Sequence, residues 1–206
     1  MNPDDPGPSA EEQLRHRVKG ELRKRMRGLR KTLPASACAE RSARIVERLS
    51  ALPPLAQARS VALFWPIEER HEVDLRALDA RLRERGARVA YPAVDPETRA
   101  MSFRFVRETS SMLEQGFGFR EPAPDAPEAP PGTLDVIVVP ALAVDPTGHR
   151  LGYGVGYYDR TLPDFAPPSV TVAVAFDFQL LAELPFTPAD VAVSFIVTDT
   201  RTLEVP

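Results

Sequence analysis

The chain has 206 residues, of which 43% are hydrophobic and 27% charged, and its formal net charge is −3. These values suit one globular domain and exclude wholesale disorder, and no apolar run approaches the roughly 18–20 residues of a membrane-spanning helix. The one cysteine, Cys38, excludes an intramolecular disulfide and a site with several thiolate ligands.

The N-terminal segment is basic, whereas the rest of the chain is acidic. Residues 1–10 are polar and rich in proline, so we expect a disordered tail without a secretory signal, followed by a single domain over residues 11–206 of a cytoplasmic protein. Residues 11–33 carry apolar side chains at steps of three, four and seven, which predicts an amphipathic helix docked on the body. Its many Lys and Arg side chains either form a solvated face or reach an anionic ligand.

Helices and short apolar strands are predicted to alternate along the rest of the chain. A second helix is expected from Ser36 to Pro53, and a third between a cap at Asp74 and a stop at Gly86. We predict a short helix at 179–184, an extended proline-rich connection at 121–131, and strands at 60–65, 88–91, 101–106, 134–139, 170–176 and 193–198. Strands that are apolar on both faces and alternate with helices predict a mostly parallel sheet covered on both sides.

Residues 148–156 form a glycine-rich loop directly after the most apolar predicted strand, and a helix is expected from Tyr157. In parallel sheets ligands bind beyond the carboxyl ends of the strands, where glycines let backbone amides approach a phosphate at a helix N-terminus. Arg150 offers a cation, and Asp159 is suited to a divalent ion that bridges phosphates. The loop lacks the Gly-Lys-Ser/Thr of a Walker A motif, and a tight strand-to-helix turn is the alternative interpretation.

The sequences VPALAVD at 139–145 and GHRLGYGVGYYDRTL at 148–162 resemble the signature of the 5-formyltetrahydrofolate cyclo-ligase family. Further support comes from the Glu72-Val-Asp74 segment and the basic N-terminal helix, and the resemblance extends from about Arg15 to Asp199. It implies a three-layer α/β/α fold with a mostly parallel sheet, of the ribose-5-phosphate isomerase/CoA-transferase-like class. It also implies ATP- and Mg²⁺-dependent cyclisation of 5-formyltetrahydrofolate to 5,10-methenyltetrahydrofolate, with release of ADP and phosphate.

The resemblance further implies a role for each matching position. The formyl oxygen would be phosphorylated and N10 of the same folate would then attack, so no protein nucleophile is required. The implied catalytic residues are Arg150, Tyr157 and Tyr158, and the implied Mg²⁺ ligands are Asp159 and Asp190. The implied ATP-binding set is Arg15, Lys19, Arg150, Leu151, Gly152, Tyr153, Gly154, Val155, Gly156, Tyr157 and Tyr158. The implied folate-binding set is Glu72, Trp65, Phe117, Gly154, Val155, Gly156, Tyr157 and Tyr158.

Several of these residues also have a purely structural interpretation. Glu72 and Asp159 would suit the start of a helix, where the dipole favours negative charge. Asp190 would suit a loop turn, and Trp65 is either a core residue or a wall of the pterin site.

Three departures from the family pattern leave alternative functions open. Val155 replaces a residue that is commonly glycine or lysine, Ala189 stands where the family usually has a histidine, and Ser194 stands where it has a further carboxylate. A non-catalytic folate-binding paralogue is therefore one alternative, and a sugar-phosphate isomerase on a related scaffold is another. We expect a monomer that binds a small-molecule folate and neither nucleic acid nor membrane, because the body is acidic and no aromatic residues interleave with the basic ones.

Overall fold

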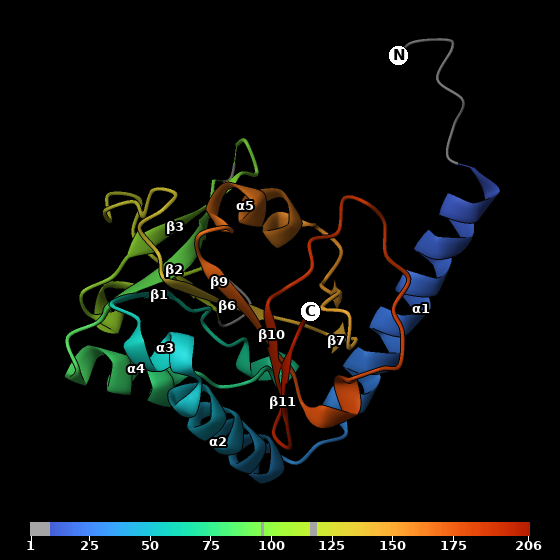
Figure 1. Ribbon diagram of the computed structural model, residues 1–206, viewed down its shortest axis with the longest axis horizontal. Helices are drawn as coiled ribbons and strands as arrows, with labels where there is room; N and C mark the ends of the chain where they lie inside the picture. Colours follow the sequence, from blue (N-terminus) through green and yellow to red (C-terminus); the bar gives the residue numbers. More distant parts are fainter. Residues whose placement is uncertain (1–8, 96, 116–118) are drawn as a thin grey trace.

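Seven short strands build the centre of the computed structural model, which describes residues 9–95, 97–115 and 119–206. The sheet order is β11-β10-β9-β6-β1-β2-β3 (Figure 1). Its five inner strands are parallel, whereas β3 and β11 pair antiparallel at the two edges, which confirms the predicted mostly parallel sheet. The strand bounds are β1 Ser60–Ala62, β2 Arg88–Val94, β3 Met101–Phe105, β6 Val136–Pro140, β9 Val170–Val174, β10 Phe195–Val197 and β11 Thr202–Glu204.

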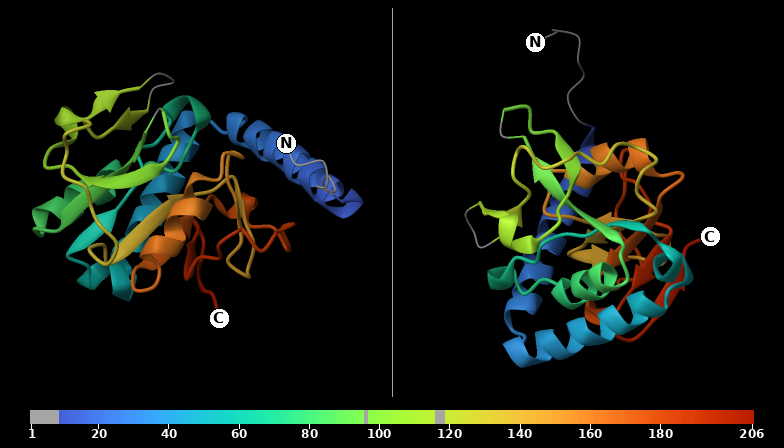
Figure 2. Two further views of the ribbon diagram at one scale, coloured as in Figure 1. Left: turned by 90° about the horizontal axis from the view of Figure 1, so that it is seen from above. Right: turned by 90° about the vertical axis from the view of Figure 1, so that its left-hand side faces the viewer.

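Helices cover both faces of this sheet, as the sequence predicts (Figures 1 and 2). On one face lie α2 (Ala35–Ala51), α3 (Pro53–Gln57) and α4 (Arg76–Glu84), and on the other lies α5 (Tyr157–Phe165). Successive side chains of a strand point to opposite faces, so Val138 packs in the core with α2 and α4 while Ile137 packs in the core with α5. The three-layer α/β/α architecture is therefore confirmed.

The first helix, α1 (Ala10–Lys31), is longer than the surface it covers. Ser9 and Glu12 form a capping box at its start. Its apolar packing lies in its second half, where Met26 joins a small core with residues of β7 and β8. The first half extends away from the body (Figures 1 and 2), which leaves Leu14 59% and Val18 39% exposed. The predicted apolar stripe is present, but only part of it is docked.

Shorter elements connect the layers. They are η1 (Glu68–Arg70), η2 (Thr109–Ser111), β4 (Leu113–Glu114), β5 (Arg120–Glu121), β7 (Ala143–Val144), β8 (Arg150–Leu151) and η3 (Asp177–Gln179). The prediction of a helix at 179–184 is wrong, because the only helical element at this point is η3, which ends at Gln179. The amide of Leu181 donates to the carbonyl of Val144 instead, and the Gln179 side chain donates to the carbonyl of Leu142 at 2.6 Å. Tertiary hydrogen bonds thus replace the local helical ones. None of the helices in the described ranges is long and apolar enough to cross a membrane.

Gly148, in the turn between β7 and β8, cannot accept a side chain without strain. Its φ is +86°, and a Cβ atom there would lie 2.7 Å from the backbone oxygen of Val193. We expect Gly148→Ala to lower the free energy of unfolding by about 2–4 kcal/mol, measured by urea denaturation. Gly20→Ala is the matched control, because nothing lies within 4 Å of its Cβ and alanine favours the helix by up to about 1 kcal/mol. A loss at Gly148 below about 0.5 kcal/mol would contradict the close contact.

Candidate active site

The second half of the glycine-rich loop, residues 152–156, lies between β8 and α5 and presents a row of unpaired backbone donors. Within the described part of the chain, the amides of residues 152–156 donate to no acceptor. Gly154 and Gly156 have φ values of +106° and +74°, which glycine adopts readily. Gly156 is also the N-cap of α5 and offers no side-chain cap to the helix. Unpaired amides next to a helix N-terminus favour an anion, and phosphate is the common one.

Buried Asp145 holds the base of this loop. Its Oδ1 accepts from the amide of Thr147 at 3.0 Å and from the amide of His149 at 3.2 Å, and its Oδ2 accepts from the amide of Leu184 at 2.9 Å. One carboxylate therefore fixes the β7–β8 turn against the segment that leads to Asp190.

Arg150 and Asp159 form an ion pair next to the loop, in which Arg150 is buried and the Asp159 side chain is 25% exposed. The Arg150 side chain is 3% exposed, and its Nη2 donates to Oδ1 of Asp159 at 2.9 Å while its Nη1 donates to the carbonyl of Val191 at 2.6 Å. Burial lowers the pKa of the Arg150 guanidinium, and the charge of Asp159 opposes that shift. Since a guanidinium stays protonated in proteins, Arg150 keeps its positive charge in a buried position, and Asp159 offsets part of it.

Cations of α1 face the loop from the opposite side and line a hollow of about 760 Å³. Nζ of Lys19 lies 2.6 Å from Oδ2 of Asp190, and Nε of Arg23 donates to the carbonyl of Gly152 at 2.9 Å. The hollow is lined by Glu12, Gln13, Arg15, His16, Arg17, Lys19, Arg23, Gly154 and Thr187. Basic side chains outnumber acidic ones in this set, so it suits a polyanionic ligand.

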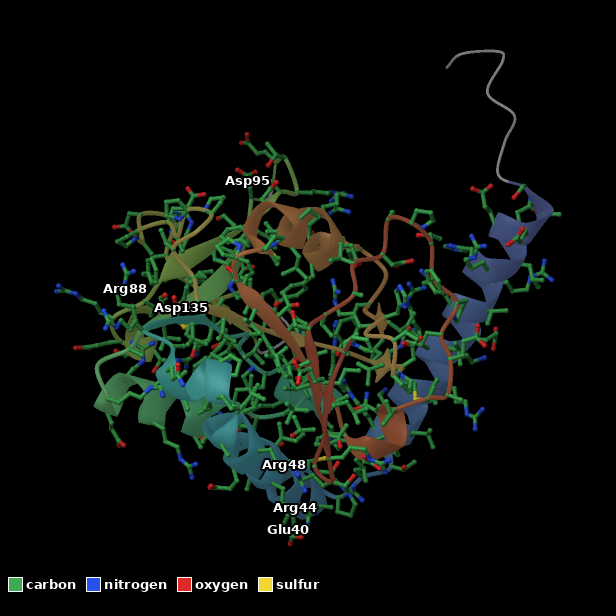
Figure 3. The ribbon with its side chains drawn as sticks, in the orientation of Figure 1. Glu40, Arg44, Arg48, Arg88, Asp95 and Asp135 are labelled. Atoms are coloured by element: carbon green, nitrogen blue, oxygen red, sulfur yellow. The ribbon has the colours of Figure 1, made fainter. Side chains whose placement is uncertain are left out.

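A second hollow of about 620 Å³ lies at the carboxyl end of β2. Asp95, which lines it, lies at the opposite end of β2 from Arg88 (Figure 3). Its walls include Trp65, Tyr153, Tyr157 and Tyr158, together with prolines of the extended connection. Its lining contains three carboxylates, Glu72, Asp95 and Glu121, of which Glu72 is buried. Aromatic walls and the buried carboxylate of Glu72 suit a flat heterocycle that carries N–H donors.

Glu72 belongs to a buried hydrogen-bonded chain that runs from this hollow to α1. Its Oε2 accepts from the amide of Ile67 at 2.9 Å, and its Oε1 accepts from the hydroxyl of Tyr153. That hydroxyl in turn accepts from Nη2 of Arg30 at 2.7 Å. Burial, followed by the charge of Glu72, raises the pKa of Tyr153 to about 12, so the phenol remains a donor at neutral pH.

Asp159 and Asp190 are suited to share a Mg²⁺ ion with a bound phosphate. Each has one oxygen committed, Oδ1 of Asp159 to Arg150 and Oδ2 of Asp190 to Lys19, and one oxygen with no partner among the described residues. Although burial opposes it, the hydrogen bonds from Lys19 and Thr187 lower the pKa of Asp190 and keep it anionic. The described residues contain no cluster of three or more metal-ligating side chains. Mg²⁺ commonly uses one or two carboxylates plus substrate phosphates, and the two aspartates fit that pattern.

The structure brings eight of the sixteen predicted site residues to the two hollows. The aromatic one is lined by Trp65, Glu72, Tyr153, Tyr157 and Tyr158, and the cationic one by Arg15, Lys19 and Gly154. The linings of the two hollows do not include Arg150, Leu151, Gly152, Val155, Gly156, Asp159 or Asp190. Leu151 differs, because its side chain is buried in the small core with Met26. Trp65 is a wall residue, and Val155 is 50% exposed at the rim of the loop. Phe117 lies outside the described residues. Ser194, one of the departures from the family pattern, hydrogen-bonds with Thr171 in the sheet.

Two arginines of α1 were missed by sequence reasoning. Arg23 follows Lys19 by four residues, so helical spacing alone places it on the same face as Arg15 and Lys19. Arg30 gives no comparable signal, because its partners Arg70 and Tyr153 lie 40 and 123 residues further along the chain.

Comparisons with known proteins agree on one family. A model of the 5-formyltetrahydrofolate cyclo-ligase family matches residues 15–199. The 5-formyltetrahydrofolate cyclo-ligase of Mycolicibacterium smegmatis is 38% identical over 147 residues, covering 69% of this chain and 75% of that protein. The one of Escherichia coli (strain K12) is 30% identical over 182 residues, covering 87% and 99%. The solved structure of Aquifex aeolicus 5,10-methenyltetrahydrofolate synthetase matches with a TM-score of 0.80 at 31% identity, covering 91% of this chain and 93% of that one. The matched stretch includes the glycine loop and most residues of both hollows.

Proposed function

The chain belongs to the 5-formyltetrahydrofolate cyclo-ligase family, and from this premise we propose that it uses ATP and Mg²⁺ to close 5-formyltetrahydrofolate to 5,10-methenyltetrahydrofolate. The observation that carries the proposal is the position of the glycine loop. Gly154 lines the cationic hollow, and the adjacent Tyr153 lines the aromatic one. Because adjacent residues of the loop line both hollows, a phosphate bound in one would lie next to a folate bound in the other. Transfer of a phosphoryl group from ATP to the folate requires this proximity.

The reaction proceeds in two displacements. The formyl oxygen attacks the terminal phosphorus of ATP, and the bond between that phosphorus and the bridging oxygen of ADP breaks. N10 of the folate then attacks the activated formyl carbon, the carbon–oxygen bond breaks, and phosphate leaves with the former formyl oxygen. N10 loses its proton, which leaves the cationic methenyl bridge. Because the nucleophile is part of the substrate, the protein supplies only position and charge.

The phosphate side of the site is built from backbone amides and α1 cations. The unpaired amides of residues 152–156 receive the phosphate oxygens, and Arg15, Lys19 and Arg23 offset their negative charge from α1. Arg150 lies next to the loop, and its buried positive charge favours the negative charge that develops on the transferred phosphoryl group. Mg²⁺ would be held by Asp159 and Asp190, and it supplies charge neutralisation to the phosphates when bound.

The folate side of the site is built from the carboxylate and the aromatic walls. Glu72 accepts hydrogen bonds from the N–H groups of the pterin, and Trp65, Tyr157 and Tyr158 enclose the ring system. Phe117 remains a predicted member of this wall. Burial raises the pKa of Tyr158, so its hydroxyl stays protonated next to the substrate.

The proposal is tested with 5-formyltetrahydrofolate, ATP and Mg²⁺ in one cuvette. We expect the near-ultraviolet absorbance of the methenyl product to rise together with released phosphate, and both signals to stop when EDTA removes Mg²⁺. Folded protein that binds the folate without turnover would favour the non-catalytic paralogue. Protein that binds pentose phosphates but not ATP would favour the sugar-phosphate isomerase.

The proposal also covers the location, the oligomeric state and the partners of the protein. We expect the chain to act as a cytoplasmic monomer on a free folate, with neither nucleic acid nor a membrane as a partner. Light scattering of the active protein measures the oligomeric state.

A further inference from the structure

We propose that Arg30 and Tyr153 are positioning residues for the folate pocket, which hold Glu72 oriented toward the pterin. This inference rests on the proposed function, because it names residues that serve the folate half of that site. It also assigns the Tyr153 side chain to the folate rather than to ATP.

The Tyr153 side chain points to a different part of the site from its two neighbours in the loop. Its neighbours in the sequence, Gly152 and Gly154, face α1 and contact Arg23. The Tyr153 ring instead lines the aromatic hollow, and its hydroxyl donates to Oε1 of Glu72. The Tyr153 side chain is therefore on the folate side of the loop, whereas the backbone amides of the loop are on the phosphate side.

Arg30 is buried, and among the described residues no carboxylate is in direct hydrogen-bonding contact with it. It is 3% exposed, and the nearest carboxylate oxygen, Oε1 of Glu72, lies 3.8 Å from its Nη2. Its guanidinium donates twice to the carbonyl of Arg70 and once to the hydroxyl of Tyr153. A buried guanidinium needs a compensating anion, and Tyr153 links it to Glu72.

The Glu72 carboxylate keeps acceptor positions for a ligand after its hydrogen bonds to the protein are counted. Oε1 of Glu72 accepts from Tyr153, and Oε2 accepts from the amide of Ile67. Each carboxylate oxygen accepts two hydrogen bonds, so one position on each remains for the N–H groups of a pterin. The guanidinium of Arg70 lies 4.8 Å above the Tyr153 ring and restrains it. The carboxylate is thus anchored on its protein side before a ligand arrives.

The chain offers a direct optical readout of this pocket. Trp65 is the one tryptophan of the sequence and lines the aromatic hollow. Its fluorescence can be titrated with 5-formyltetrahydrofolate in the absence of ATP, which separates folate binding from turnover.

We expect Tyr153→Phe to raise the Kd and the KM for 5-formyltetrahydrofolate by about tenfold, while the KM for ATP changes by less than about twofold. In a Glu72→Gln background, adding Tyr153→Phe should change the folate Kd by less than about twofold, because Tyr153 acts through Glu72. Arg30→Met should weaken folate binding similarly, and Arg30→Lys should recover part of it. Arg27→Met, at an exposed position one turn earlier on α1, is the matched control and should leave both KM values unchanged.

Three results would overturn the inference. The first is a Tyr153→Phe variant that raises the KM for ATP but not for folate. The second is a folate Kd that Tyr153→Phe weakens equally with and without Glu72→Gln, which would mean that Tyr153 acts independently of the carboxylate. The third is wild-type protein that neither turns over nor quenches Trp65 fluorescence, in which case the proposed function fails as well. If Arg30→Met does not fold, as judged by thermal unfolding, Tyr153→Phe still decides the question because it removes only one oxygen.

Discussion

Replacing Arg150 with methionine is expected to lower kcat/KM for ATP by about 10²–10³-fold, the usual effect of losing one preorganised charge at a phosphoryl-transfer site. Arg150 combines two tasks. It places a buried positive charge behind the phosphate-binding amides, and it ties Asp159 to the carbonyl of Val191, next to Asp190. Arg150→Lys keeps the charge but cannot make both contacts, so its activity should lie between those of the wild type and Arg150→Met.

The control for this prediction separates catalysis from stability. Arg150→Met leaves Asp159, which is 25% exposed, with the amide of Val191 as its remaining donor among the described residues, and this is expected to cost about 1–3 kcal/mol of the free energy of unfolding. Adding Asp159→Asn removes that charge, so the double variant should regain stability in urea denaturation without regaining activity. If activity returned together with stability, Arg150 would be a structural residue and the charge argument would be wrong.

The fold was predictable where the local sequence pattern and the tertiary contacts of a segment favour the same structure. The apolar strand at 134–139 becomes β6, in the middle of the sheet, because residues buried on both faces fit no other place. The helix predicted at 179–184 does not form, because Gln179 and Leu181 donate hydrogen bonds to the carbonyls of Leu142 and Val144. These acceptors are far away in the sequence, so the local pattern could not reveal them. The stripe of α1 predicted a helix correctly, but periodicity carries no information on how far the body extends beneath it.

The candidate site likewise has one part that the sequence predicts and one part that depends on tertiary contacts. The glycine loop, Arg150 and Asp159 lie within one continuous motif, so the sequence alone indicated a phosphate-binding segment. The α1 cations become part of the site only through tertiary contact, and Lys19 and Asp190, predicted for ATP and Mg²⁺ separately, meet in one ion pair. The chain from Arg30 to Glu72 could not be inferred from the sequence, because each of its hydrogen bonds joins distant segments.

A second large effect is expected at Gly154, where alanine should lower kcat/KM for ATP by about 10²-fold. The φ of Gly154 is +106°, which an L-residue rarely adopts, and a Cβ atom would lie 3.4 Å from Nε and Cζ of Arg23. The 3.4 Å separation is an ordinary van der Waals contact, so the strain lies in the backbone. We expect the loop to change conformation to relieve it, which turns its amides away from the phosphates. Folate binding, followed by Trp65 fluorescence, should weaken by less than about threefold, because the pterin is proposed to contact Glu72 and the aromatic walls rather than these amides.

Comparison of two glycines in the same loop tests whether backbone conformation is the cause. Gly152 has no positive φ, and nothing lies within 4 Å of the position of its Cβ, so Gly152→Ala should cost much less activity than Gly154→Ala. Gly28→Ala on α1, also open around its Cβ, controls for the addition of a methyl group elsewhere. Equal losses at residues 152 and 154 would mean that a methyl group simply blocks the phosphates. Only a loss confined to the position with the left-handed backbone supports amides that are held ready by the conformation of the loop.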